Sequence, residues 1–286
     1  MVNFAPTWYK MKKHITTFIS LLIFGIHISN GQTFTYFQPL DYKGQFFGYW
    51  GWNIDAYTTS DIHFKGENYD FILDNVKAND RQSNFDVKLY CNPLRATIPQ
   101  YNFRFGYFIS PHYNISFGID HMKYVVKQLQ VVGIDGYIDN PASNYSSIYE
   151  DYEILIRPGF LQFEHTDGLN YINTEYRRVD NLITGPHLKL NATEGVSAGI
   201  LLPKTNCTLL DNARYDEFHL AGFGMGILAG INLEIYKYFF IQSEFKGGYI
   251  NMSDIRTTEF PEDRADQQFG FVQWNVVFGA NFNLNK

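Results

Sequence analysis

Ionisable side chains that could do chemistry together lie in two short segments of the chain. His121 and Lys123 end the first segment, and Glu164, His165 and Asp167 lie near the start of the second. A histidine beside an amine and carboxylates can bind a phosphate, hold a metal ion or transfer protons. We take these residues together as the candidate catalytic cluster.

Each member of this cluster also has a simpler structural interpretation. Lys123 could extend its amine to lipid phosphates, and the Asp167-Gly168 pair is typical of a turn. Glu164 and His165 are adjacent, so on a strand they point to opposite faces and at most one of them can join a given site. The cluster is therefore a hypothesis that depends on the elements that carry it.

Those elements are predicted to be β-strands, because apolar residues recur at every second position. The pattern is clearest at the end of the chain, where polar or small residues alternate with an apolar row: Val272, Trp274, Val276, Phe278, Ala280, Phe282 and Leu284. In a membrane barrel such a row faces lipid and the alternate row faces the lumen. A soluble β-sandwich would show the same period, but with shorter rows.

Repetition of this pattern predicts strands at residues 45–57, 99–109, 113–126, 160–180, 187–202, 218–235, 238–251 and 268–284. Short turns at 110–112 and 236–238 lie at one end, and long polar connections lie at the other: 58–98, 127–159, 203–217 and 252–267. This asymmetry is typical of outer-membrane barrels. We predict an all-β, closed antiparallel up-and-down transmembrane β-barrel of eight strands with long extracellular loops. Ten strands form only if residues 69–76 and 85–90 also cross.

The predicted barrel places the candidate cluster at its outer rim. His121 and Lys123 continue the outward row of Ile115, Phe117 and Ile119 to the height of lipid headgroups. The third and fourth strands are antiparallel neighbours, and side chains that face each other across such a pair lie about 5 Å apart.

Several inward positions carry charges or amides, which indicates a filled lumen. These are Asn53, Asp55, Arg104, Asp120, Gln242, Glu244, Lys246, Asn275 and Asn281. An eight-stranded barrel is just wide enough for side chains to fill it. A general porin is therefore excluded, and a narrow solute path would need more strands.

The N-terminus predicts export. Residues 1–31 are typical of a signal peptide, with Met11 as an alternative start, a basic Lys12-Lys13 pair, an apolar stretch at 15–28 and cleavage before Gln32. Residues 32–286 then form a single barrel domain in the bacterial outer membrane of a Gram-negative cell envelope. In that oxidising compartment Cys91 and Cys207 could form a disulfide or remain separate thiols.

Composition excludes several other classes of protein. A net charge of −6 argues against a nucleic-acid partner, and the sequence has no Walker loop for a nucleotide. A mean hydropathy of −0.24 excludes a helical membrane bundle. Aromatic residues make up 18% of the chain, which favours strands at a membrane interface.

Two motifs carry a resemblance to a known family. The H-x-K stretch His121-Met122-Lys123 and the T-D-G-L-N stretch from Thr166 to Asn170 resemble those of small outer-membrane barrels of the lipid A oxidase type. The resemblance implies a barrel beside lipopolysaccharide in the outer leaflet and an oxygen-dependent oxidation of the proximal glucosamine of lipid A, with a divalent metal as a candidate cofactor. It assigns no established catalytic residue to this chain.

The alternative to an enzyme is a structural barrel whose loops bind a partner or mediate adhesion. Polar segments such as Asp211-Asn212 and Pro261-Glu262-Asp263 fit surface display, and weak Ca²⁺ binding, although their spacing is not that of a known calcium loop. Either kind of barrel is expected to be monomeric and to contact outer-membrane lipid.

Overall fold

The computed structural model describes residues 34–84, 86, 88, 99–141 and 143–283. The predicted signal peptide at 1–31, most of the segment 85–90, and Cys91 lie outside these residues, so the predictions made for them are not tested. Among the described residues, no helix is long and apolar enough to span a membrane.

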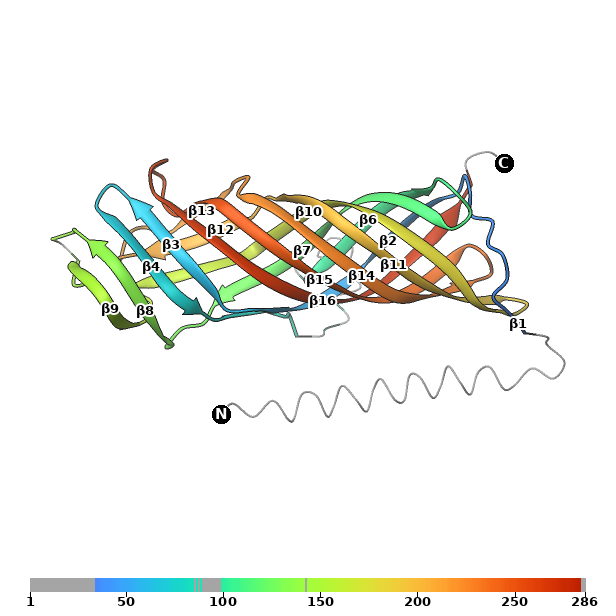
Figure 1. The fold of residues 1–286 in the computed structure, drawn as a ribbon, viewed down its shortest axis with the longest axis horizontal. Coiled ribbons are helices and arrows are strands. Elements are labelled where there is room, and N and C mark those ends of the chain that lie inside the picture. Colours follow the sequence, from blue (N-terminus) through green and yellow to red (C-terminus); the bar gives the residue numbers. More distant parts are fainter. Residues whose placement is uncertain (1–33, 85, 87, 89–98, 142, 284–286) are drawn as a thin grey trace.

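Antiparallel strands close into a ring, as the sequence predicts (Figure 1). Its eight members follow the order of the chain: β2 (Phe46–Tyr57), β6 (Tyr101–Phe108), β7 (Tyr113–Val126), β10 (Leu161–Thr184), β11 (Leu188–Leu201), β14 (Gly222–Ile235), β15 (Phe239–Arg256) and β16 (Arg264–Phe282). The ring closes where β16 pairs with β2, from Phe271 opposite Tyr57 to Phe282 opposite Phe46. The prediction of eight strands is confirmed, and residues 69–76, which a ten-strand barrel would have used as a further crossing strand, lie outside the ring.

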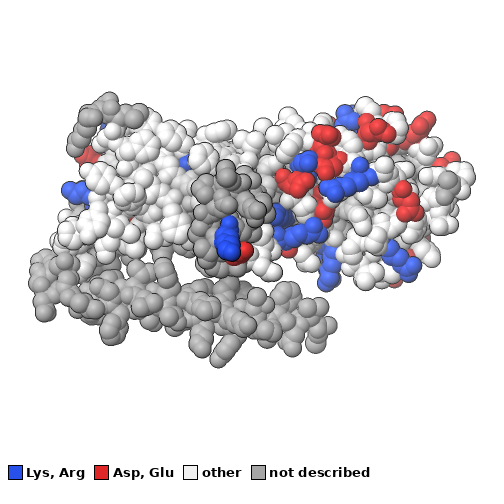
Figure 2. Space-filling model, turned by 180° about the vertical axis from the view of Figure 1, so that it is seen from behind, with Lys and Arg blue, Asp and Glu red and all other residues white. Residues whose placement is uncertain are grey.

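The outer surface of the ring is apolar. On β14, Phe223, Met225, Ile227 and Ile231 are exposed at alternate positions, as the two-residue period predicts. On the face shown in Figure 2, charged side chains gather over the extracellular half of the molecule, and the other half is nearly free of them. A closed barrel with such a belt satisfies its backbone hydrogen bonds internally and can face lipid, which is the architecture of bacterial outer-membrane proteins.

The long connections fold into further strands beyond one end of the ring, where loops were expected. They form β3 (Ser60–Gly66), β4 (Tyr69–Val76), β8 (Val131–Ile138), β9 (Ser147–Leu155), β12 (Lys204–Leu209) and β13 (Tyr215–Phe218), besides the short β5 (Ala78–Asn79). The short β1 (Thr35–Tyr36) precedes the ring and pairs with the opposite end of β10, at Ile183 and Thr184. β3 pairs with the start of β16, and from there the sheet continues in the order β4, β8, β9. Separately, β12 pairs with the start of β10. Since β4 pairs with β3 and β8, it extends the structure above the membrane and does not cross it.

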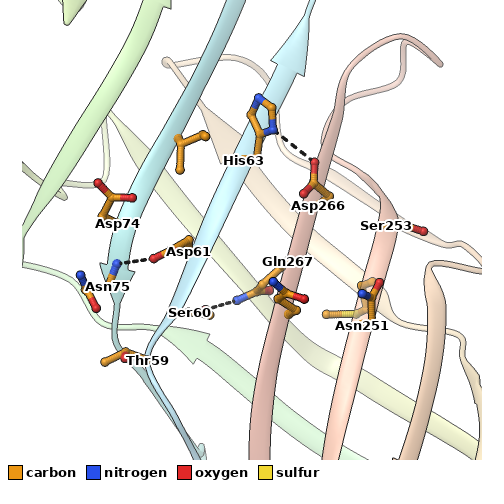
Figure 3. Close-up of a pocket in the computed structure, with 13 residues that line it drawn as sticks. Thr59, Ser60, Asp61, His63, Asp74, Asn75, Asn251, Ser253, Asp266 and Gln267 are labelled. Atoms are coloured by element: carbon orange, nitrogen blue, oxygen red, sulfur yellow. Dashed lines mark hydrogen bonds and ion pairs between the residues drawn. The ribbon is translucent and has the colours of Figure 1, made fainter. Parts of the chain in front are cut away.

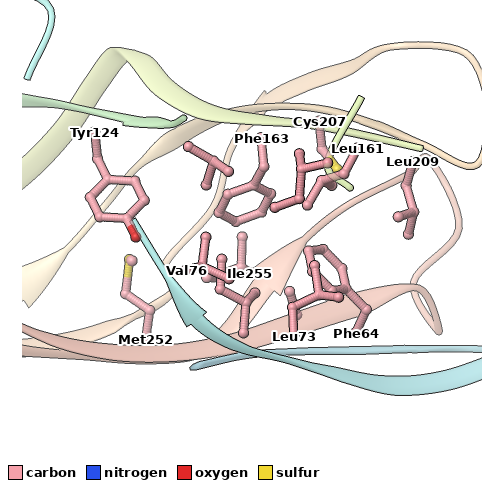
Figure 4. Close-up of a cluster of buried hydrophobic side chains, with 14 of the residues drawn as sticks. Phe64, Leu73, Val76, Tyr124, Leu161, Phe163, Cys207, Leu209, Met252 and Ile255 are labelled. Carbon is pink, nitrogen blue, oxygen red and sulfur yellow. The ribbon is translucent and has the colours of Figure 1, made fainter. Parts of the chain in front are cut away.

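This extracellular extension has its own apolar core (Figure 4). Phe64 and Phe71 from the first connection stack with ring centroids 5.3 Å apart, and Phe163 of β10 meets Phe64 edge-on at 5.7 Å. Cys207 is buried in the same cluster, and burial raises the pKa of its thiol. Apolar packing therefore makes the extension an ordered structure.

Candidate functional site

The barrel lumen is filled by a network of buried ion pairs. Glu175 lies at its centre, 3.0 Å from Arg104 Nη2, 2.6 Å from Lys246 Nζ and 2.6 Å from Arg177 Nε. Asp120 pairs with Arg104 and Lys246, and Glu244 pairs with Arg177. The three cations match the three carboxylates, so no member is left as an uncompensated buried charge.

The network agrees with the predicted inward set and adds to it. Arg104, Asp120 and Lys246 point inward as predicted, and the sequence reasoning missed Glu175 and Arg177. Both alternate with the exposed Tyr176 on β10, so the two-residue period carried the signal. Because these side chains occupy the middle of the lumen, the lumen leaves no room there for an external ligand.

A groove of about 590 Å³ lies on the outside of the barrel at its extracellular rim. Ile119 and Ile172 form its membrane-side wall and continue the lipid-facing rows of β7 and β10. His121, Lys123 and Asp167 form its polar wall. We call this the rim groove. It brings together those three members of the predicted cluster.

His121 is held in place by contacts on two sides. Its ring stacks on Tyr101 with centroids 4.9 Å apart, and its Nδ1 lies 2.8 Å from Asn170 Oδ1. Tyr101 and Asn170 lie directly opposite His121 on the two neighbouring strands, β6 and β10. Antiparallel register thus fixes the imidazole, and its second nitrogen is not part of these contacts.

Asp167 reaches the groove because β10 bulges beside it. The register with β7 shifts between His165, opposite Tyr124, and Leu169, opposite Met122. Gly168 allows the bulge: its φ is +132°, and a Cβ there would lie 2.5 Å from the amide of Asn170. The T-D-G stretch therefore has a structural role, and the Asp167-Gly168 pair, which is typical of a turn, here forms part of a β-bulge.

Charged residues surround the polar wall of the groove. Lys123 interacts electrostatically with the carboxylates of Asp80 and Asp167 and with the guanidinium of Arg81. Burial raises the pKa of the Asp80 carboxyl to about 6. Lys204 Nζ lies 3.3 Å from Asp167 Oδ2. Above pH 6 the rim thus combines amines, a guanidinium and carboxylates next to the apolar belt.

Glu164 and His165 lie outside the groove and point to opposite sides, as adjacent strand residues must. Glu164 forms an ion pair with Arg81, 2.9 Å apart, and accepts a hydrogen bond from the Asn206 amide at 2.8 Å. His165 is fully buried in the extracellular core between Tyr124 and Phe163. The structure thus does not bring these two residues to His121.

Burial makes His165 a source of acid sensitivity. Desolvation lowers the pKa of His165 to about 3, below the usual 6.5, so the unfolded chain binds its proton more tightly than the folded one. Stability should be unaffected above about pH 6.5 and should fall by up to about 1.4 kcal/mol per pH unit as the pH decreases towards 3. His165→Gln should flatten that decline in urea unfolding. The exposed His187, changed to Gln, is the control, and equal slopes for both variants would contradict the prediction.

A second groove, of about 640 Å³, lies on the outside of the molecule between β3 and β4 and the extracellular ends of β15 and β16 (Figure 3). Asp61, Asp74 and Asp266 give it an acidic lining, and His63 lies between Asp266, at 3.4 Å, and Asp70, at 2.6 Å. No residue pattern in the sequence predicted this groove. Within the described parts of the chain, no group of three or more His, Cys, Asp or Glu side chains is arranged to hold a metal ion.

Comparisons with known proteins return only distant likenesses of fold. No family model and no curated protein matches the chain. Among solved structures, it is similar to Ail, the attachment invasion locus protein of Yersinia pestis, with 10% identity over 84% of this chain and 99% of that one and a TM-score of 0.34. It is also similar to OprG from Pseudomonas aeruginosa, with 9% identity, 86% and 99% coverage and a TM-score of 0.34. Neisserial surface protein A shows 9% identity, 81% and 96% coverage and a TM-score of 0.29.

Proposed function

We propose that this outer-membrane barrel binds the phosphorylated headgroup of an outer-leaflet glycolipid of the lipid A class in the rim groove. The observation that carries the proposal is the division of the groove into two walls. Ile119 and Ile172 continue the surface that faces acyl chains, and His121 and Lys123 lie directly beyond them. A lipid that spans this border would place its chains against one wall and its headgroup against the other.

The charges of the polar wall suit a phosphate-bearing sugar. The Lys123 amine offers a compact positive charge, and the nearby Arg81 side chain is more than half exposed. The flat Tyr101–His121 stack offers a surface for a sugar ring. Asp167 supplies acceptors for sugar hydroxyls. Each contact is of ordinary strength, so we expect moderate affinity and dependence on ionic strength.

Chemical modification of the bound lipid is the finer form of the proposal. The motifs that form the groove, His121-Met122-Lys123 and Thr166 to Asn170, are those that resemble the lipid A oxidase type. His121 is the group in the groove best suited to proton transfer. The described residues of the groove do not bring three metal-ligating side chains together, so no step of this proposal uses a divalent metal.

Lipid binding is tested with the purified, folded full chain in nanodiscs that contain lipid A. Bound lipid A is counted by native mass spectrometry. We expect His121→Ala and Asp167→Asn to reduce it by about five- to tenfold, the equivalent of one lost hydrogen bond of about 1–1.5 kcal/mol. Lys123→Gln should reduce it further because it removes a charge. The control is Lys237→Gln, which removes an exposed lysine from a turn at the opposite end of the barrel.

Modification is tested separately by the mass of lipid A from oxygenated cells. An oxidase should convert the C1 hemiacetal of the proximal glucosamine to the acid, with O2 accepting two electrons to give H2O2 and water supplying the added oxygen atom. The mass of lipid A should then rise by one oxygen atom in cells with the wild-type chain and not in those with His121→Ala. An unchanged spectrum together with specific binding would assign the barrel to the non-enzymatic class. If all groove variants retain lipid as the wild type does, in folded barrels, the binding proposal fails.

A further inference from the structure

We propose that the free edge of β9 is a docking site for an extended, basic segment of a partner polypeptide, which binds as an added β-strand. The site lies at the far end of the extracellular extension, away from the rim groove (Figure 1). It is therefore independent of lipid binding. An edge strand can pair with another chain through its unused backbone groups, and adjacent side chains then select the partner.

β9 is the last strand of its sheet. Within the described residues it pairs only with β8, from Ser147 opposite Ile138 to Leu155 opposite Val131. A shallow hollow of about 640 Å³ lies across the tip of this hairpin, lined by residues 136–139 and 146–150. The other side of β9 has no strand paired with it among the described residues.

Apolar side chains on this hairpin are exposed although they lie far beyond the lipid-facing belt. Ile148 is 77% exposed and is paired with Tyr137, which is also exposed. Tyr152 faces the core side, opposite the buried Ile134, but remains 59% exposed because no strand follows β9. A strand added there would cover Tyr152 and extend the core. Exposed apolar surface of this kind marks an interaction site.

The charge of the hairpin selects the partner. Residues 131–155 contain Asp135, Asp139, Glu150, Asp151 and Glu153 and no lysine or arginine. Glu150 and Glu153 are exposed on β9 itself. An approaching strand therefore gains attraction if it carries lysine or arginine on the outer face, beside Glu150 and Glu153, and apolar residues at its alternate positions would lie beside Tyr152 on the core face.

The same features oppose pairing between two copies of this chain. Two β9 edges would bring like charges together, which is destabilising. β9 also bulges at Asp151, whose φ is 49° and where the register with β8 shifts. Bulges and charges are the devices that keep edge strands from self-association. The favoured occupant is thus a different, basic chain.

The probe is a fluorescent peptide of about ten residues in which lysine alternates with valine. Its binding to the folded full chain in neutral detergent is measured by anisotropy, and the protected amides are located by hydrogen exchange. We expect binding, slower exchange along β9, and marked weakening as salt is raised. The double variant Glu150→Lys/Glu153→Lys should bind at least about tenfold more weakly, with unchanged migration on gels.

Matched controls separate strand addition from simple charge attraction. Glu217→Lys/Glu259→Lys makes the same charge change at exposed residues elsewhere on the extension and should bind the peptide normally. A peptide with central prolines keeps its charge but lacks backbone donors, so it should bind weakly. Equal binding of the proline peptide, no protection of β9, or a dimer of this chain that protects β9 without peptide would each overturn the proposal.

Discussion

Glu175→Ala should lower the free energy of unfolding of the barrel by about 3–5 kcal/mol, the usual cost of removing one partner from a buried ion pair. Glu175 is fully buried and contacts Arg104, Arg177 and Lys246. Its loss would leave positive charges in the lumen with only Asp120 and Glu244 to balance them. We expect a lower midpoint in urea unfolding and heat-induced unfolding on gels at a lower temperature.

Asp180→Ala provides the control for an ion pair in the same strand. Asp180 Oδ2 lies 2.6 Å from Arg178 Nε, but both side chains are well exposed. Exposed pairs contribute about 0–1 kcal/mol, so the midpoint should change little. Equal effects of the two variants would show that the lumen network does not stabilise the barrel as its geometry indicates.

Phe71→Ala should destabilise the extracellular extension by about 3–5 kcal/mol, because it leaves a cavity in a packed core. Phe71 is fully buried and contacts Phe64, Tyr69 and Phe160. Limited proteolysis is the sensitive measurement, since it reports opening of the extension separately from unfolding of the ring. We expect rapid cleavage above the membrane while the barrel strands stay protected.

Ile72→Ala is the matched control, since Ile72 is the next residue on β4 and points outward. It should leave proteolysis nearly unchanged, because little apolar surface is lost there. If Phe71→Ala also stays resistant, the connections are held by their backbone pairing and not by the core. That result would also weaken the argument that Tyr152 belongs to an incomplete edge of this core.

The positions of the ring strands could be predicted from sequence because the signal is local. Every second residue from Val272 to Phe282 faces lipid, and the same rule placed Ile119 and His121 on one side of β7. Which face of the sheet a residue occupies follows from its position within its own strand, so the rest of the chain is not needed to predict it. The filled lumen was predictable in the same way, from polar residues at the alternate positions.

The composition of the rim groove depended on the tertiary structure. Simple alternation counted back from Asn170 turns Asp167 inward, towards the side of the buried Tyr171. The bulge at Gly168 reverses this and exposes Asp167 beside His121. A bulge is set by the pairing of β10 with β7, and a single strand pattern does not contain that information.

The extracellular strands also depended on contacts that local sequence patterns do not reveal. Their segments are polar enough to be expected as loops, but the first two connections each bury several apolar residues, such as Phe64 and Ile134, and the third adds Cys207. Local residue patterns were enough to place these connections outside the membrane and to locate the ring strands. That the connections form an ordered extension could not be predicted from them, because its stability comes from apolar burial between segments far apart in the chain.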